Sequence, residues 1–364
     1  MSLRCGIAGL PNVGKSTLFN ALTKSAIAAE NYPFCTIEPN IGMVAVPDPR
    51  LARIAATAKP QKVVPAAVEF VDIAGLVAGA SKGEGLGNKF LAHIREVDAI
   101  VHVVRAFDDP NVVHVAGKVD PLSDIETIHT ELALADLQAV DKQLLKFEKV
   151  AKVAGDKDAQ RLVAVLQKTQ AALDQGKPAR ALDWAKEERM VLDPLFLLTM
   201  KPTLYVANVD EHGFKDNPKL AAIQKCAAAE GAQSVAICAA IEAQIADMPE
   251  ADRKVFLDDM GMDEPGLNRF IRAAYALLGL ETFFTAGPKE AHAWQLHVGQ
   301  TASEAAGTIN TDFQRGFIRA EVIACEDYVA CGGEQGAKEA GKMRLEGKDY
   351  VVQDGDVIYF RFNV

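Results

Sequence analysis

The sequence predicts an α/β fold, in which a mostly parallel, doubly wound sheet is interrupted by a helical insertion and followed by a small α+β module. Three observations predict this fold. Short apolar runs alternate with helical patterns, as in parallel sheets. A stretch of about ninety residues without a strand pattern separates two of these runs, and it is much longer than an ordinary crossover. After Leu280 the sequence changes to short β-like segments between glycine-rich turns.

The first predicted elements are a strand at 3–8 and a helix at 15–22, joined by a glycine-rich turn. The later apolar runs of the sheet are predicted strands at 68–71, 100–104, 203–207 and 235–238. The C-terminal module has predicted strands at 294–298, 319–323, 350–352 and 357–362. The predicted domains are an α/β domain at 1–120 and 200–278, an insertion at 121–199 and a C-terminal domain at 279–364.

The insertion at 121–199 has apolar residues at spacings of three and four, which predicts two amphipathic helices. A break at 154–156 indicates that the helices are antiparallel. Such a hairpin is either an arm that binds a partner or a segment that packs only on its own chain.

Length and composition indicate a folded protein with more than one core. The chain has 364 residues, 49% hydrophobic and 24% charged, which matches globular proteins and exceeds what one core usually serves. The formal net charge of −10 opposes indiscriminate binding to nucleic acid or anionic lipid. Any site for a polyanion must therefore be local.

The sequence predicts a cytoplasmic protein without a membrane partner. Its apolar stretches are much shorter than the ~20 residues that cross a bilayer, and the N-terminal residues lack the features of a signal peptide. The six scattered cysteines form no C-x-x-C pair and are expected to be free thiols. No pattern indicates an oligomeric state.

Residues 9–16, Gly-Leu-Pro-Asn-Val-Gly-Lys-Ser, satisfy the pattern G-x-x-x-x-G-K-[S/T] between a predicted strand and a predicted helix. Backbone N–H groups and the positive helix end can then converge on phosphate oxygens. We expect Lys15 to reach the β- and γ-phosphates, Ser16 to hold Mg²⁺ and Thr17 to support the α-phosphate. The predicted binding residues of this loop are Asn12, Val13, Gly14, Lys15, Ser16 and Thr17.

A second phosphate motif, Asp72-Ile-Ala-Gly75, follows a predicted strand in the order expected after such a loop. We expect Asp72 to hold Mg²⁺ through water and the Gly75 N–H to bind a γ-phosphate. Thr36 lies in an irregular segment, where a threonine either completes the Mg²⁺ shell or is an ordinary turn residue. The predicted metal ligands are therefore Ser16, Thr36 and Asp72.

Taken together, these motifs resemble the YchF subfamily of the Obg-like P-loop NTPases. The resemblance covers nearly the whole chain and rests on the phosphate loop, the helical insertion and the segments 72–76, 208–211 and 333–342. It implies a Ras-like P-loop domain with an inserted coiled-coil arm and a C-terminal ubiquitin-like TGS domain. It also implies a preference for ATP and association with the ribosome.

The base-reading motif departs from the N-K-x-D of guanine-specific relatives. Asn208 is present, but Val209 replaces the lysine that lies along the base, and Glu211 replaces the aspartate that pairs with guanine. The Asn208 amide and nearby backbone groups can pair with adenine instead. These residues favour ATP, and a relaxed pocket that accepts either base is the alternative.

The catalytic residue is the second departure, because Leu76 stands where Ras-like enzymes place a water-orienting glutamine. Hydrolysis must be slow or use another group. His114 lies in the loop after the strand at 100–105, at the edge of the sheet that faces a ligand. The predicted catalytic residues are therefore Lys15 and His114, although His114 can equally be a packing or surface histidine.

Asn12 raises the question of a second cation. The resemblance implies that its amide oxygen can hold K⁺ beside the phosphates, where the ion supplies the charge that an arginine finger otherwise brings. An asparagine required by the turn explains the residue equally well.

The predicted function is a slow ATP-hydrolysing switch that binds the ribosome, with the segments around Thr36 and 72–76 as its switches. An Obg-type GTPase and a non-hydrolysing, nucleotide-gated binding module are the alternatives. A phosphotransferase ranks below them, because the sequence offers no acceptor site.

Contact with ribosomal RNA requires positive charge, and residues 279–364 carry only eight Lys and Arg against thirteen acidic residues. Four lysines of the insertion fall on about a third of a helix circumference. This lysine stripe comprises Lys142, Lys146, Lys149 and Lys152. It is either a phosphate-binding surface or an ordinary solvated helix face.

Overall fold

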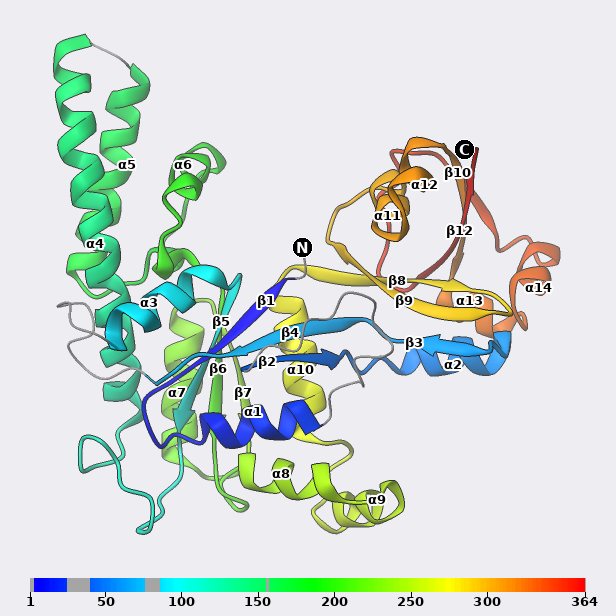
Figure 1. The fold of residues 1–364 in the computed structure, drawn as a ribbon, viewed down its shortest axis with the longest axis horizontal. Helices are drawn as coiled ribbons and strands as arrows, with labels where there is room; N and C mark the ends of the chain where they lie inside the picture. Colours follow the sequence, from blue (N-terminus) through cyan, green and yellow to red (C-terminus); the bar gives the residue numbers. More distant parts are fainter. Residues whose placement is uncertain (1–2, 25–39, 76–85, 155–156, 364) are drawn as a thin grey trace. The chain divides into compact units, whose positions relative to one another are not determined.

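The structure is a computed structural model that describes residues 3–24, 40–75, 86–154 and 157–363 (Figure 1). Thr36, Cys35 and Leu76 lie outside these residues. The chain divides into two compact units. The first unit comprises Met1–Ser25, Glu38–Gly42 and Glu69–Ala273, and the second comprises Ala26–Ile37, Met43–Val68 and Ala274–Val364.

A six-stranded sheet with the order β2-β4-β1-β5-β6-β7 forms the centre of the nucleotide-binding fold. Its strands are β1 (Arg4–Ala8), β2 (Ile41–Ala45), β4 (Ala67–Asp72), β5 (Ala99–Arg105), β6 (Thr203–Asn208) and β7 (Gln233–Ile237). The pairs β1–β4, β1–β5, β5–β6 and β6–β7 are parallel. The predicted parallel sheet is confirmed. The strands β1, β5 and β6 are nearly fully buried, because helices cover both faces of the sheet.

Helices alternate with these strands. They are α1 (Lys15–Lys24), α3 (Leu86–Glu96), α4 (Pro121–Ala154), α5 (Lys157–Asp174), α6 (Lys186–Leu192), α7 (Pro218–Ala229), α8 (Ala239–Asp247), α9 (Glu250–Asp259) and α10 (Gly266–Leu277). Short 3₁₀ turns are η3 (Ala179–Ala181), η4 (Asp193–Leu195) and η5 (Leu198–Met200).

The strand register shows that α10 and α4 cover opposite faces of the sheet. Phe70 of β4 contacts Phe270 of α10, and it lies in the same row as Ala99 of β5. His102 lies three residues beyond Ala99, so its side chain points to the other face. On that face His102 lies beside His129 of α4.

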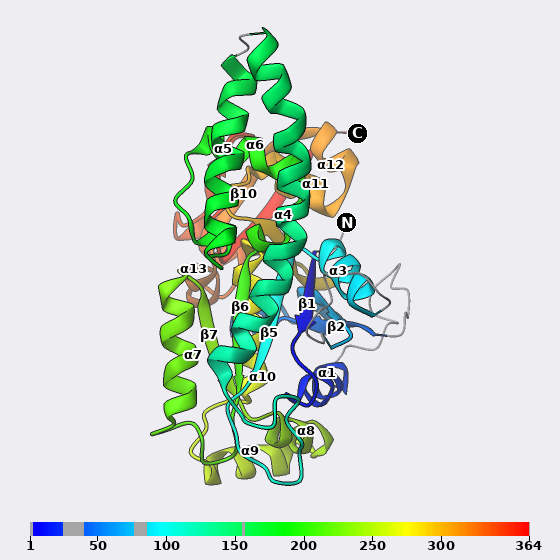
Figure 2. The same cartoon turned by 90° about the vertical axis from the view of Figure 1, so that its left-hand side faces the viewer.

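The helical insertion follows β5 and is confirmed as a hairpin. The helices α4 and α5 run side by side away from the sheet (Figures 1 and 2). The hairpin has its own apolar core, formed by Ala133, Val140, Leu144, Val165, Leu166, Leu173, Leu192 and Leu197. Among the described residues between β5 and β6 no strand is present.

A polar cluster joins the base of this hairpin to the sheet. The phenol of Tyr205 on β6 lies 2.8 Å from Nε2 of His129 and donates to Glu230 at 2.9 Å. Arg180 donates to the same carboxylate at 2.7 Å. Burial lowers the pKa of His129 to about 4.

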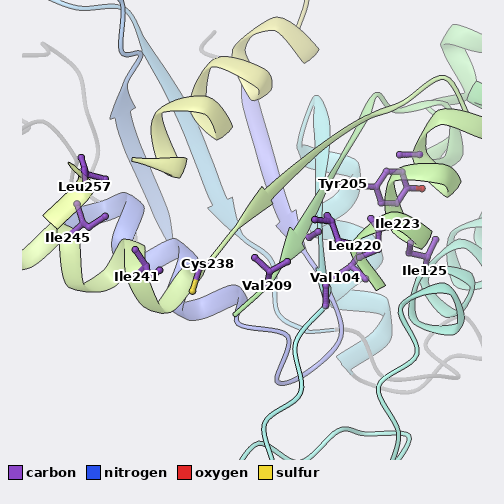
Figure 3. Close-up of a cluster of buried hydrophobic side chains, with 13 residues drawn as sticks. Val104, Ile125, Tyr205, Val209, Leu220, Ile223, Cys238, Ile241, Ile245 and Leu257 are labelled. Carbon is purple, nitrogen blue, oxygen red and sulfur yellow. The ribbon is translucent and has the colours of Figure 1, made fainter. Parts of the chain in front are cut away.

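The apolar layer beneath the edge of β6 and β7 holds the C-terminal half of this unit together (Figure 3). Val104 and Tyr205 from the sheet pack with Ile223 of α7 and Ile241 of α8. Val209 and Cys238, which directly follow β6 and β7, belong to the same cluster. The chain segments that follow these two strands are therefore fixed by the core.

The second unit contains a mixed sheet with the order β11-β10-β12-β8-β9-β3. Its strands are β3 (Lys62–Val64), β8 (Leu280–Ala286), β9 (Glu290–His297), β10 (Phe317–Ala324), β11 (Arg344–Glu346) and β12 (Asp356–Phe362). Its helices are α2 (Pro49–Ala58), α11 (Ala302–Ile309), α12 (Thr311–Arg315), α13 (Cys325–Ala330) and α14 (Glu334–Glu339).

Two features of this unit differ from the predictions. The strand predicted at 350–352 is wrong, because Val351 forms only an isolated bridge with Thr301. Residues 43–68 belong to this unit, although the sequence places them in the nucleotide-binding domain. The reason is long-range pairing, since β3 pairs with β9 and Arg50 binds Asp354 at 2.7 Å.

The described cysteines are Cys5, Cys226, Cys238, Cys325 and Cys331, and all are free thiols, as predicted. Within the described part of the chain, no helix has the length and apolar character needed to cross a membrane.

Candidate nucleotide-binding site

The phosphate loop joins the end of β1 to the start of α1. Asn12 and Gly14 adopt φ angles of 62° and 92°, and the second position requires glycine. A Cβ added to Gly14 would lie 2.1 Å from Nδ2 of Asn208. Ser16 and Thr17 are exposed in the first turn of α1, where backbone N–H groups are free to bind an anion.

Lys15 and Asp72 meet beside this loop. They form an ion pair, with side chains that are 10% and 17% exposed. Asp72 is the last residue of β4, and it lies beside Ile7 of β1. The pairing of these two strands therefore places the Asp72 carboxylate next to the phosphate loop. A Cβ added to Gly75 would lie 3.6 Å from the Gly9 oxygen. The two phosphate motifs are therefore neighbours.

These side chains fit a magnesium ion that is bound mainly through phosphate. Within the described residues, no group of three or more His, Cys, Asp or Glu side chains is placed to hold a metal. Mg²⁺ in phosphate sites takes one or two protein ligands and completes its shell with water and phosphate oxygens. The Ser16 hydroxyl and the Asp72 carboxylate match that need, and Thr36 lies outside the described residues.

A cavity of about 500 Å³ extends from the phosphate loop along the carboxyl ends of β5, β6 and β7. We call it the base cavity. Its lining residues are Asn12, Gly14, Thr17, Phe107, Asp108, Asp109, Pro110, Val112, Asn208, Val209, Asp210, Cys238, Ala239 and Ala240. The sequence predictions missed residues 238–240. Their position directly after a predicted strand was the available signal.

Asn208 lines the base cavity and links the phosphate loop to the start of α8. Its Nδ2 donates to the Val13 carbonyl at 2.9 Å, and its Oδ1 accepts from the Ala239 N–H at 3.0 Å. Each end of the amide thus has one partner within the protein, which leaves one N–H and one oxygen lone pair, and its predicted pairing with adenine stays a prediction. The Glu211 side chain is 63% exposed and lies beside His212, outside the cavity lining.

His114 is buried near the start of α4, with a side chain that is 3% exposed. The Ala116 N–H donates to Nδ1 at 3.2 Å, so the ring proton lies on Nε2 and is donated to Asp124 at 3.1 Å. Burial raises the pKa of Asp124. His114 does not line the base cavity. Its link to the phosphate loop is indirect, because Nδ2 of Asn12 donates to the Val113 carbonyl at 3.0 Å.

Arg105, which sequence reasoning missed, organises the loop that leads to His114. It ends β5 and is 1% exposed. Its guanidinium donates to the carbonyls of Phe107, Asp109 and Val112 at 3.2, 3.2 and 3.0 Å. A charged residue at the end of an apolar strand is the signal that could have found it.

Comparison with known proteins identifies the family. A curated relative from Haemophilus influenzae, named ribosome-binding ATPase YchF, is 59% identical over 364 residues, and both chains are covered completely. The chain belongs to the YchF family. A YchF relative of the same name from Bacillus subtilis is 55% identical over 367 residues, again with complete coverage.

Structural comparison agrees with this family. The solved YchF GTPase of Schizosaccharomyces pombe matches with a TM-score of 0.89 at 36% identity, over 99% of this chain and 98% of that one. The family model described as 50S ribosome-binding GTPase matches residues 4–168. The YchF-GTPase_C model, described as a protein of unknown function, matches residues 280–363. The predicted YchF resemblance and α/β P-loop GTPase fold are confirmed.

Proposed function

We propose that this chain is a slow ATPase that acts as a nucleotide-dependent switch on the ribosome. The observation that carries the proposal is the convergence of the phosphate loop, the Lys15–Asp72 pair and the base cavity at one edge of the sheet. The names of the bacterial relatives support ATP hydrolysis and ribosome binding. A cytoplasmic location and ATP as the small ligand accompany this function.

ATP is the proposed nucleotide because Glu211, which stands in place of the aspartate that pairs with guanine in N-K-x-D, does not line the base cavity. A guanine-specific site directs a carboxylate at two ring donors, whereas the exposed Glu211 is not among the residues that line the cavity. Val209 covers the wall where a lysine stem would lie. The Val209 and Ala239 N–H groups donate to the Ile237 carbonyl and to Asn208 within the protein. We therefore propose that adenine is read by other polar groups of the cavity wall, including the remaining N–H and lone pair of the Asn208 amide.

In the proposed mechanism, backbone N–H groups of residues 12–17 bind the phosphates and Lys15 offsets the charge that develops as the β–γ bond breaks. Mg²⁺, when bound, supplies further positive charge; Ser16, Thr36 and Asp72 are its proposed ligands. Asn12 is the proposed ligand of an optional K⁺. Gly75 senses the γ-phosphate, and His114 orients the attacking water once it is free to do so.

Phosphate release from ATP and GTP tests this function. We expect turnover with ATP above that of the Lys15→Ala variant, and tighter binding of ATP than of GTP in direct competition. Tighter GTP binding would favour an Obg-type GTPase. Phosphate release no greater than that of Lys15→Ala would favour a non-hydrolysing binding module.

The domain assignments are part of the same proposal. Apart from residues 43–68, which belong to the second unit, the proposed nucleotide-binding domain spans 1–120 and 200–278, with 121–199 as a coiled-coil arm and 279–364 as a TGS domain. The order β9-β8-β12-β10-β11 supports a ubiquitin-like module. The lysines of the stripe are all exposed on α4, which supports a contact with ribosomal RNA.

A further inference from the structure

The ring of His114 is fully engaged inside the protein. Nδ1 accepts from the Ala116 N–H, and Nε2 donates to Asp124. A histidine that orients water needs a ring nitrogen free to bind that water. This conformation therefore keeps His114 away from the base cavity, although its neighbour Val112 lines the cavity wall.

The hydrogen bond to His114 Nε2 comes from the helical arm. Asp124 lies in the first turn of α4, a single helix of 34 residues that continues into the hairpin. Its side chain is 5% exposed. Among the described residues, the hydrogen bond that the Asp124 carboxylate accepts comes from His114. Both groups are buried, and each would lose a hydrogen-bond partner if the other moved. The Asp124 carboxylate and the His114 imidazole therefore hold each other in position.

The loop before His114 is held differently, by groups of the nucleotide site. Arg105 binds the Val112 carbonyl, and Asn12 of the phosphate loop binds the Val113 carbonyl. Two residues flank the imidazole with exposed side chains, Val113 at 74% and Val115 at 55%. His114 is therefore the residue at which contacts from the phosphate loop and contacts from the arm meet.

We propose that Asp124 is a positioning residue that withholds His114 from the phosphate site, so that a shift of the first turn of α4 releases the imidazole for hydrolysis. The arm thereby regulates turnover without touching the nucleotide. The inference rests on the proposed role of His114.

Steady-state ATP hydrolysis by the full chain tests it, with kcat and KM measured separately. Asp124→Ala leaves the His114 N–H without its acceptor in the buried position, which favours release. We expect kcat to rise about ten-fold, with KM for ATP nearly unchanged. Asp124→Asn keeps a weaker, neutral acceptor, so we expect a rise of about three-fold.

The matched controls separate release of His114 from a general effect on the arm. Asp136→Asn changes another buried carboxylate of α4 and should leave kcat unchanged. The double variant His114→Ala/Asp124→Ala should be as slow as His114→Ala, because the gain requires the imidazole. If Asp124→Ala does not fold, Asp124→Asn decides by the same comparison.

Two results would overturn the inference, and they are distinguishable. Unchanged or lower kcat in both Asp124 variants, with His114→Ala slower than the native chain, removes the role of Asp124 and leaves the proposed function intact. Native turnover in His114→Ala removes the catalytic role of His114 and the role of Asp124 with it.

Discussion

Asp124 and Asp136 both lie on α4, and both carboxylates are buried. Burial raises the pKa of each. Asp136 accepts three hydrogen bonds from one turn of the chain, from the Leu198 N–H at 2.9 Å and from the Thr199 N–H and hydroxyl at 2.8 and 2.7 Å. Asp124 accepts from the imidazole of His114.

The difference lies in the donors. Backbone N–H groups of a packed 3₁₀ turn cannot leave Asp136 unless the turn unfolds, so that contact fixes the hairpin. A side chain from a loop can leave Asp124 by rotating, so that contact can open at a modest cost. The same buried carboxyl group thus serves as a permanent support at one point of the helix and as a reversible one at another.

The largest expected effect is on stability at the permanent support. Asp136→Ala removes three hydrogen bonds and leaves their donors buried, so we expect a loss of about 4 kcal/mol in the free energy of unfolding. Urea denaturation measures it. Asp124→Ala should lose much less, and an equal loss in the two variants would contradict the comparison.

The lysine stripe sharpens the comparison, because it lies beyond Asp136 on the same helix. We expect a variant with all four lysines replaced by glutamine to bind ribosomes about hundred-fold more weakly, equivalent to about 2.7 kcal/mol. Co-sedimentation measures this affinity, and its dependence on salt concentration should become less steep. The replaced residues are Lys142, Lys146, Lys149 and Lys152. ATP hydrolysis without ribosomes should stay intact.

The matched control for the stripe changes Lys338, Lys342 and Lys348, exposed lysines of the second unit. Full ribosome binding by the stripe variant and loss of binding by the control would move the contact to the C-terminal domain.

His129 lies between the two carboxylates on α4 and tests whether the base of the arm is permanent. Its folded pKa of about 4 lies below the ordinary value of 6.5, so between these values the unfolded chain binds a proton that the folded chain does not. Stability should therefore fall as the pH falls, by about 2 kcal/mol between pH 6.5 and 5.

His129→Gln should flatten this pH dependence, although His102, whose pKa burial also lowers, retains a share of it. His93 is an exposed histidine of the same unit, and His93→Gln is the matched control for the loss of one histidine. A native slope in His129→Gln would show that the cluster at the base of the arm tolerates a charged imidazole.

The smallest expected effect is on turnover and concerns Asn12, the residue of the phosphate loop that donates to the Val113 carbonyl beside His114. If its amide oxygen holds K⁺, turnover should be about five-fold higher in K⁺ than in Na⁺ at matched ionic strength, equivalent to about 1 kcal/mol. The difference should disappear in Asn12→Ala. Equal rates in the two salts would leave Asn12 with its contact to Val113 alone.

The parts of the site that follow from local sequence could be predicted. The phosphate loop has its own signature, and the carboxyl ends of parallel strands place Asp72, Asn208 and the loop of His114 at one edge. The partners that act at long range could not be predicted. No local pattern pairs His114 with Asp124, gives both ends of the Asn208 amide to other groups, or brings residues 43–68 to the C-terminal sheet.

The buried guanidinium of Arg105 has a consequence for the order in which this region opens. Its three carbonyl partners belong to a loop that has neither helix nor strand. Unfolding that loop alone would leave a cation without partners at the end of the central strand. We therefore expect residues 106–113 to open together with β5, so that their hydrogen-bonded amides, such as those of Ala106 and Val112, exchange with solvent as slowly as the amides of the strand.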